Sequence, residues 1–220
     1  MISLEERIPD DLINIFCERL QNAMGEKPDG MLAMQFVTCD PVAVRAHING
    51  ERHAYQIIHD EARGHYILLE WKGSGHRRYV RVYDPLMPKR NLHSRDMEEM
   101  ITKCVRQQIV ALFGHLFDSH YITVALFCGL QRQHDDWSCG LRAIGHLTLL
   151  ATSNGQRRIS QIDFKLRNLL KFFTQIINEE RPSLDKFRNA KLGRKRPTSR
   201  RAFFVKTFLH KKTLNLKSAR

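Results

Sequence analysis

Apolar residues recur at helical spacing in several stretches of the chain. Between Asp10 and Gln21 they lie three or four positions apart behind an acidic start, as in a helix with one buried face. The same spacing predicts the longest helix over Ser94 to Phe113 and another over Ile159 to Ile177. A nearly continuous apolar run from Leu141 to Leu150 predicts a further helix.

Shorter apolar runs predict strands. They are expected over four segments, namely Leu32–Val37, His65–Trp71, Arg77–Tyr83 and Tyr121–Phe127. In the third segment the residues alternate, which places Tyr79, Arg81 and Tyr83 on one face and Val80 and Val82 on the other. Helices that flank a small sheet make an α+β domain.

Two polar residues mark the ends of these strands. His65 stands at the head of one strand, and Asp84 follows the end of the next. The segment Gly73-Ser74-Gly75 between them has turn chemistry and predicts a hairpin. Because the start of one antiparallel strand lies beside the end of its partner, His65 and Asp84 are expected at the same edge. An Asp that accepts from one imidazole nitrogen fixes the tautomer and leaves the other nitrogen to take a proton.

A cysteine opens the apolar helix, in the run Gln133-His134-Asp135-Asp136-Trp137-Ser138-Cys139-Gly140. The unpaired amides and the positive dipole of a helix start favour the thiolate form of a cysteine. Gly140 lets a substrate backbone come close to the sulfur. The amide of Cys139 and the side chain of Gln133 can donate to the negative oxygen of a tetrahedral intermediate. The pattern predicts a nucleophilic cysteine with His65 as its base.

These residues follow the order of a known family. The ubiquitin-like-protein-specific cysteine proteases, also called the SUMO-protease-type or Ulp family, carry a His, an Asp, a Gln and a Cys-Gly in this order along the chain. The present sequence resembles this family at four positions, namely His65, Asp84, Gln133 and Cys139. Ile8–Phe16 resembles the entry helix of the family, and Tyr55–Asp60 resembles versions of the domain carried by mobile elements. The resemblance spans roughly residues 8 to 180. It implies a papain-like cysteine protease architecture, with the catalytic Cys at a helix N-terminus and a small central sheet flanked by helices.

The resemblance also implies an activity. A family member is an isopeptidase or endopeptidase that hydrolyses the bond after the Gly-Gly C-terminus of a ubiquitin-like modifier, and it needs no cofactor and no metal. Tyr66, Gly140 and Trp137 are the expected substrate-binding residues, with Tyr66 covering the narrow channel for Gly-Gly. This chain departs from the cellular members at three positions: Tyr66 replaces Trp, Ser138 replaces Asp and Pro85 replaces Ser. Whether the modifier is of the SUMO or the ubiquitin type stays open.

Other interpretations of the same residues remain. An acetyltransferase of the same clan would pass an acyl group from acetyl-coenzyme A through Cys139, and a non-catalytic module would dock on nucleic acid. Gln131 competes with Gln133 as the oxyanion donor, whereas His134 and Asp135 are expected to be solvated. A metal site is not expected, because the gaps between four candidate ligands do not match structural zinc: Cys128, His134, Cys139 and His146.

Charge divides the chain unevenly. All 23 acidic residues lie at or before Asp185, together with 23 of the 36 Lys and Arg residues, so the formal net charge of +13 belongs to the segment beyond. We expect a protease domain over residues 1–185 and a basic tail over residues 186–220 that is largely disordered. Such a tail suits nucleic acid or an acidic protein partner.

Cysteine usage and hydropathy suggest where the protein acts. Five cysteines without framework spacing favour a reducing compartment, and four of them, Cys17, Cys39, Cys104 and Cys128, look like packing residues. No apolar run approaches the roughly 20 residues that span a bilayer, and the acidic start is unlike a targeting signal. We expect a monomer in the nucleus or the cytoplasm, with no membrane contact.

Overall fold

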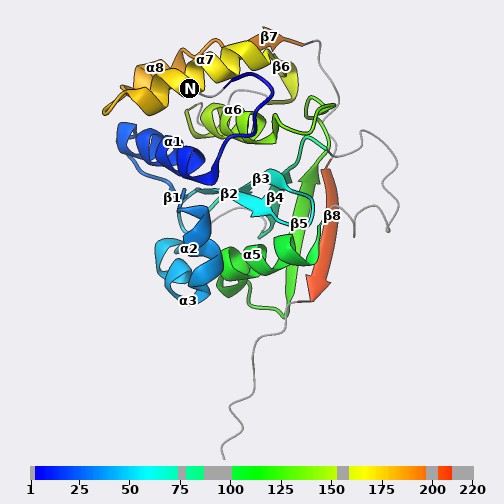
Figure 1. The fold of residues 1–220 in the computed structure, drawn as a ribbon. Helices are drawn as coiled ribbons and strands as arrows, with labels where there is room; N and C mark the ends of the chain where they lie inside the picture. The colour runs from blue at the N-terminus through cyan, green and yellow to red at the C-terminus, as the bar shows by residue number, and fades with distance from the viewer. Residues whose placement is uncertain (1–2, 74–77, 87–100, 153–158, 197–202, 210–220) are drawn as a thin grey trace, which may run out of the picture.

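The computed structural model describes residues 3–73, 78–86, 101–152, 159–196 and 203–209 (Figure 1). Its centre is a mixed six-stranded sheet in the order β1-β2-β3-β4-β5-β8. The strands are β1 (Asp29–Gly30), β2 (Ala54–Asp60), β3 (His65–Trp71), β4 (Val80–Tyr83), β5 (Tyr121–Phe127) and β8 (Phe203–Leu209). The pairs β1/β2 and β4/β5 are parallel, and the other three pairs are antiparallel.

Helices cover both faces of this sheet, as Figure 1 shows. One layer holds α1 (Asp10–Ala23), α6 (Cys139–Thr152), α7 (Leu166–Asn178) and α8 (Leu184–Arg188). The opposite layer holds α2 (Met34–Cys39), α3 (Pro41–Val44) and α5 (Lys103–Phe113). Short 3-10 turns lie at Arg45–His47, Gly114–Leu116 and Ile159–Gln161, and a second, two-stranded sheet joins β6 (Ile162–Phe164) to β7 (Gly193–Lys195). The predicted α+β class, with helices flanking a central sheet, is confirmed.

Strand alternation separates the core into two clusters. Tyr66, Leu68 and Tyr83 belong to the cluster under α1 and α6, whereas Val80 and Val82 belong to the cluster under α5. The predicted faces of β4 are therefore correct, because successive side chains of a strand point to opposite sides of its sheet.

Helix α6 lies at the centre of its layer. Every residue from Cys139 to Ala151 is buried. At Gly145 a Cβ atom would lie 2.9 Å from both Leu169 Cδ2 and Phe164 Cζ, so only glycine lets α7 and β6 approach this closely. A helix with apolar residues on all sides is stable only when it is enclosed, as α6 is.

Three element predictions need correction. Residues 34–37 of the predicted strand Leu32–Val37 belong instead to the short helix α2, whose Met34 and Val37 are buried three positions apart. The helix predicted over Ser94–Phe113 begins at Lys103, where Thr102 caps it, and residues 94–100 lie outside the described part. Over Ile159–Ile177 the first turn is 3-10 and residues 162–164 are strand β6, because they pair with β7, a partner that local periodicity does not reveal.

The C-terminal segment takes part in the fold. Phe187 of α8 is fully buried, and its ring lies 5.8 Å from that of Phe16. Strand β7 pairs with β6, and β8 pairs with β5 over its whole length. These elements differ from the largely disordered tail expected from residue 186 onward, because counting charges overlooked buried apolar residues such as Phe187 and Leu192. Residues 197–202 and 210–220 of that tail lie outside the described residues. Within the described ranges, no helix has the length and apolar character to cross a bilayer.

Candidate active site

The hairpin of β3 and β4 brings two of the expected site residues together. Leu68 pairs with Tyr83 across the hairpin, so the head of β3 lies beside the end of β4. His65 Nε2 lies 2.8 Å from Asp84 Oδ1, and both side chains are almost fully buried. The imidazole therefore donates its Nε2 proton to the carboxylate, which leaves Nδ1 as the ring nitrogen available to another partner.

That partner is the thiol of Cys139 at the first residue of α6. The thiol interacts with His65 and with the backbone amides of Tyr66 and Gly140. Burial alone would raise the pKa of Cys139, but these interactions and the charge of His65 lower it below its usual value. The structure thus brings His65, Asp84 and Cys139 into one connected group.

The pKa values of the other two members of this group, His65 and Asp84, shift in the directions that stabilise an ion pair. Burial would lower the pKa of His65, yet its hydrogen bonds to Asp84 and Cys139 raise it to about 9. Burial would raise the pKa of Asp84, but His65 and Arg63 hold it below its ordinary value. At neutral pH these directions favour a thiolate, an imidazolium and a carboxylate in a row. A thiolate beside a proton donor can attack a carbonyl and then protonate the leaving group.

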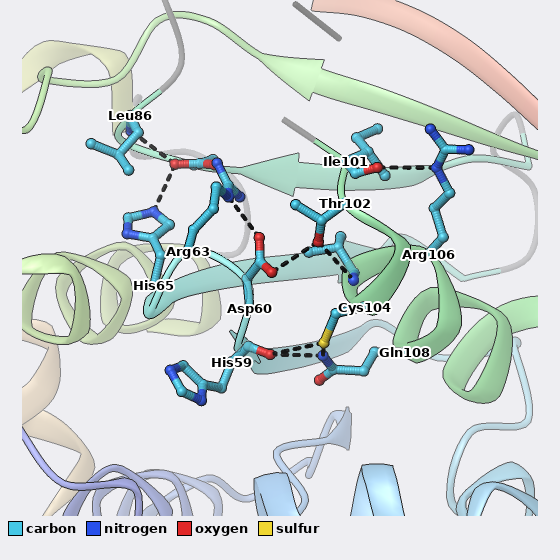
Figure 2. Close-up of polar contacts among 12 residues, drawn as sticks. His59, Asp60, Arg63, His65, Leu86, Ile101, Thr102, Cys104, Arg106 and Gln108 are labelled. Atoms are coloured by element: carbon cyan, nitrogen blue, oxygen red, sulfur yellow. Dashed lines mark hydrogen bonds and ion pairs between the residues drawn. The ribbon is translucent and has the colours of Figure 1, made fainter. Parts of the chain in front are cut away.

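Asp84 has further partners that the sequence analysis missed. Its Oδ1 also accepts from the Leu86 amide at 2.8 Å, and its Oδ2 lies 3.0 Å from Arg63 Nη1. Figure 2 shows Arg63 reaching across from the turn between β2 and β3, with Leu86 on the far side. A cation two residues before His65 was the available signal, but only the turn geometry shows that it reaches Asp84.

Gln133 is attached to the same edge of the sheet. Its backbone amide donates to the carbonyl of Pro85 at 3.0 Å, which places its loop beside the residue after Asp84. Its Nε2 donates to the carbonyl of Asp135 at 2.8 Å. The same nitrogen also donates to Oδ1 of Asp135 at 3.4 Å, so both hydrogen bonds of this carboxamide nitrogen go to Asp135.

Asp135 fixes the loop that leads into α6. Its Oδ1 accepts from the amide of Ser138 at 2.7 Å, and its Oδ2 accepts from the hydroxyl of Ser138 at 2.8 Å. Arg142 Nε donates to the same hydroxyl at 2.9 Å. The expectation of a solvated Asp135 is therefore wrong, because the carboxylate satisfies amides at the start of the helix.

Gln131, the competing oxyanion donor, is engaged elsewhere. Its Oε1 accepts from Arg142 Nη1 at 3.0 Å and from the amide of Phe164 at 2.8 Å. These bonds give Gln131 a structural task in joining α6 to β6.

The three expected substrate-binding residues surround the start of α6. The hydroxyl of Tyr66 donates to the carbonyl of Ile8 at 3.1 Å and also contacts the carboxylate of Asp10. A Cβ atom at Gly140 would lie 3.2 Å from Ile13 Cδ1 and 3.3 Å from Tyr66 Cδ2, so this glycine lets α1 and β3 pack closely against α6. Trp137 is half-buried against the same core cluster.

Among the residues that the structure describes, no group of three or more His, Cys, Asp or Glu side chains could hold a metal ion. His146, weighed above as a ligand, lies buried in α6 with its ring 4.8 Å from that of Phe164.

Comparisons with known proteins do not assign a function to this chain. The sequence matches no protein-family model and no curated protein. Among solved structures, the chain is similar to one described as "SUMO protease Ulp1 with the catalytic cysteine oxidized to a sulfenic acid". The TM-score is 0.48 at 12% identity, with 80% of this chain and 77% of that chain covered. At this level of likeness, the chemistry of the site has to come from the residues of this chain.

Proposed function

We propose that this protein is a cysteine peptidase that hydrolyses the bond after the Gly-Gly C-terminus of a ubiquitin-like modifier. The observation that carries the proposal is the ring of His65, which joins Asp84 on one side and the Cys139 thiol on the other. The order and spacing of these residues, with Gln133 six positions before Cys139, supports a modifier as the substrate.

The reaction follows from the positions of the three side chains. The Cys139 thiolate attacks the carbonyl carbon of the terminal glycine and forms a C–S bond. The His65 imidazolium gives its proton to the leaving amine as the C–N bond breaks, and a thioester remains. His65 then takes a proton from water as the water attacks the thioester, and the thiol and a free carboxylate are released. Asp84 orients the ring throughout.

Gln133 and the amide of Cys139 are the proposed donors to the tetrahedral oxyanion. The loop of Gln133 is fixed on Pro85, and the helix start supplies the amide of Cys139. Donors that are held in place before the reaction stabilise developing charge without reorganising, which is worth roughly 3–4 kcal/mol for one donor.

The burial of the nucleophile supports a substrate without side chains near the scissile bond. Cys139 is only 1% exposed, and Tyr66 and Gly140 pack around it. A chain that reaches this sulfur has to be thin, and two glycines are the thinnest peptide segment available. Replacing the last glycine of the modifier by alanine is therefore expected to block cleavage.

The experiment measures hydrolysis of SUMO and ubiquitin conjugates by the wild-type protein, by Cys139→Ala and by the matched control Cys39→Ala. Cys39 is an exposed cysteine outside the site. Cleavage should be lost in Cys139→Ala alone. Full hydrolysis by that variant would disprove the proposal. An acetyl group on Cys139 after incubation with acetyl-coenzyme A, without conjugate cleavage, would support the acetyltransferase instead.

A further inference from the structure

A buried ionic network extends from Asp84 away from His65. Arg63 Nη1 lies 3.0 Å from Asp84 Oδ2, and Arg63 Nε lies 2.6 Å from Asp60 Oδ2. The side chains of Asp60 and Asp84 are completely buried, and that of Arg63 is 19% exposed. Figure 2 shows Arg63 between the carboxylate of Asp60 and the neighbourhood of His65. One guanidinium thus serves two buried carboxylates.

The turn between β2 and β3 places this guanidinium. The amide of Arg63 donates to the carbonyl of Asp60 at 3.1 Å, and the amide of Gly64 donates to the carbonyl of Glu61 at 3.3 Å. Gly64 takes a φ of +56°, which a residue with a side chain rarely adopts. The tight turn directs the side chain of Arg63 back over the ends of β2 and β4.

Asp60 is held from its other side by α5. Its Oδ1 accepts from the hydroxyl of Thr102 at 2.8 Å. The same hydroxyl accepts from the amide of Val105 and so caps α5. Asp60 therefore has one oxygen on the helix start and the other on Arg63, which fixes where Arg63 can lie.

The partners of Asp84 divide between its two oxygens. Oδ1 takes the hydrogen bonds from His65 and Leu86, whereas Oδ2 faces Arg63. Hydrogen bonds at Oδ1 and the ion pair at Oδ2 together orient the carboxylate, and the guanidinium also pairs with the second buried negative charge at Asp60. Without that cation the two carboxylates would repel each other, and Asp84 would bind a proton more readily.

We propose that Arg63 is a positioning residue that keeps Asp84 ionised and correctly oriented toward His65, and that Asp60 sets the place of Arg63. The proposal rests on the triad of the proposed function. Within the described part of the chain, the charged and titratable groups around Asp84 are Arg63 in the turn, Asp60 from β2, His65 from β3 and, beyond the ring, Cys139 from α6.

The test uses peptide-resolved alkylation of Cys139 by chloroacetamide across a pH series, because this rate follows the thiolate and needs no substrate. The variants are Arg63→Met, which removes the charge but fills the space, and Asp60→Asn, which removes the competing carboxylate. Arg63→Lys keeps a charge but cannot bridge two carboxylates in a fork. Thermal unfolding confirms that each variant folds.

In Arg63→Met the acid limb of the alkylation profile should move up by about 1 pH unit or more, because Asp84 loses its cation. The kcat/KM for conjugate cleavage should fall about tenfold or more at neutral pH, with KM little changed, since Arg63 does not touch the substrate. In Asp60→Asn the acid limb should stay or move down, because Asp60 no longer competes with Asp84 for the charge of Arg63. In Arg63→Lys the acid limb of the alkylation profile should stay at the wild-type pH, and the kcat/KM for conjugate cleavage should fall only in part.

An acid limb in folded Arg63→Met that coincides with the wild-type limb would overturn the proposal, and so would an upward shift in Asp60→Asn. If Arg63→Met does not fold, Arg63→Gln replaces it as the uncharged variant. Should the wild-type protein cleave no modifier while the limb still moves in Arg63→Met, the positioning role stands and the proposed function fails. If the wild-type and Arg63→Met proteins both cleave conjugates and their acid limbs coincide, the positioning role fails and the proposed function stands.

Discussion

At the scale of single residues, the chemistry depends on one imidazole that contacts an acid and a thiol. His65 donates to Asp84 and interacts with Cys139. Each contact offsets the cost of burying a charge, which is why the thiol ionises more easily and the ring holds its proton more strongly than usual. Neither change would follow from burial alone, since burial acts in the opposite direction on both groups.

Asp84→Asn tests the role of the carboxylate. An amide in place of the carboxylate can present its NH2 group to the ring and so favour the wrong tautomer, and it also removes the charge that stabilises the imidazolium. The kcat/KM for conjugate cleavage should fall about 10³-fold or more. Circular dichroism should show an unchanged fold. A folded variant that keeps most of its activity would show that the carboxylate is dispensable.

The pH profile of conjugate cleavage by the wild-type protein tests the ion pair. Activity should rise as the thiol ionises at a pH below its ordinary value, and should fall as His65 loses its proton with a pKa of about 9. The fall follows because a neutral ring neither stabilises the thiolate nor protonates the leaving amine. The measurement is kcat/KM against pH. A rate that begins to rise only near the pKa of a free thiol would contradict the ion pair.

At the scale of elements, the local patterns of the sequence predicted most of the site. Period-two alternation and a glycine-rich turn gave the hairpin of His65 and Asp84, and an apolar run gave helix α6 with Cys139 at its start. Arg63 was missed because its contact with Asp84 depends on a turn whose path no pattern reveals. Strand β6 was missed for a similar reason, because its partner β7 lies about 30 residues further along the chain.

Helix α6 also carries a buried histidine with no catalytic task in this account. Among the described residues, neither ring nitrogen of His146 has a hydrogen-bond partner. Burial and the nearby charge of Arg142 lower its pKa from 6.5 to about 3. Below pH 6.5 the unfolded chain binds a proton that the folded chain refuses, so the stability that the neutral ring contributes is lost between pH 6.5 and pH 3.

His146→Leu should remove this acid sensitivity. The free energy of unfolding of the wild-type protein should fall below pH 6.5 by up to about 1.4 kcal/mol per pH unit through this residue, and the variant should lose correspondingly less. Near neutral pH the variant should be as stable as the wild type, because leucine leaves no unsatisfied nitrogen. Urea unfolding of the two proteins near neutral pH and below pH 6.5 measures the difference in their acid-induced loss of stability. Equal acid losses in the two proteins would show that the ring is not the acid-sensitive group.

At the scale of the whole molecule, two helical layers enclose a mixed sheet, and the layer with α6 is completed by the C-terminal segment. Charge counting placed a boundary at residue 185, but the aromatic rings of Phe16, Phe172 and Phe187 pack together across it. Net charge describes how a segment interacts with solvent and partners, and it says little about whether single apolar residues are buried.

Phe187→Ala measures how far the fold depends on this segment. Removing a fully buried phenylalanine should lower the free energy of unfolding by about 3–5 kcal/mol. The matched control is Val42→Ala, at a residue that is 74% exposed, where the change should stay within about 0.5 kcal/mol. Denaturant unfolding of both variants gives the values. Equal stabilities would mean that residues from 186 onward are dispensable for the core.

The most direct measurement treats the protein with SUMO and ubiquitin probes that carry a C-terminal electrophile, and locates the adduct by mass spectrometry. A covalent adduct should form on Cys139 in the wild-type protein, persist in Cys39→Ala, and become much slower in His65→Ala and Asp84→Asn. An adduct on another cysteine, or labelling of Cys139 that does not depend on His65, would contradict a nucleophile activated by its histidine and aspartate neighbours.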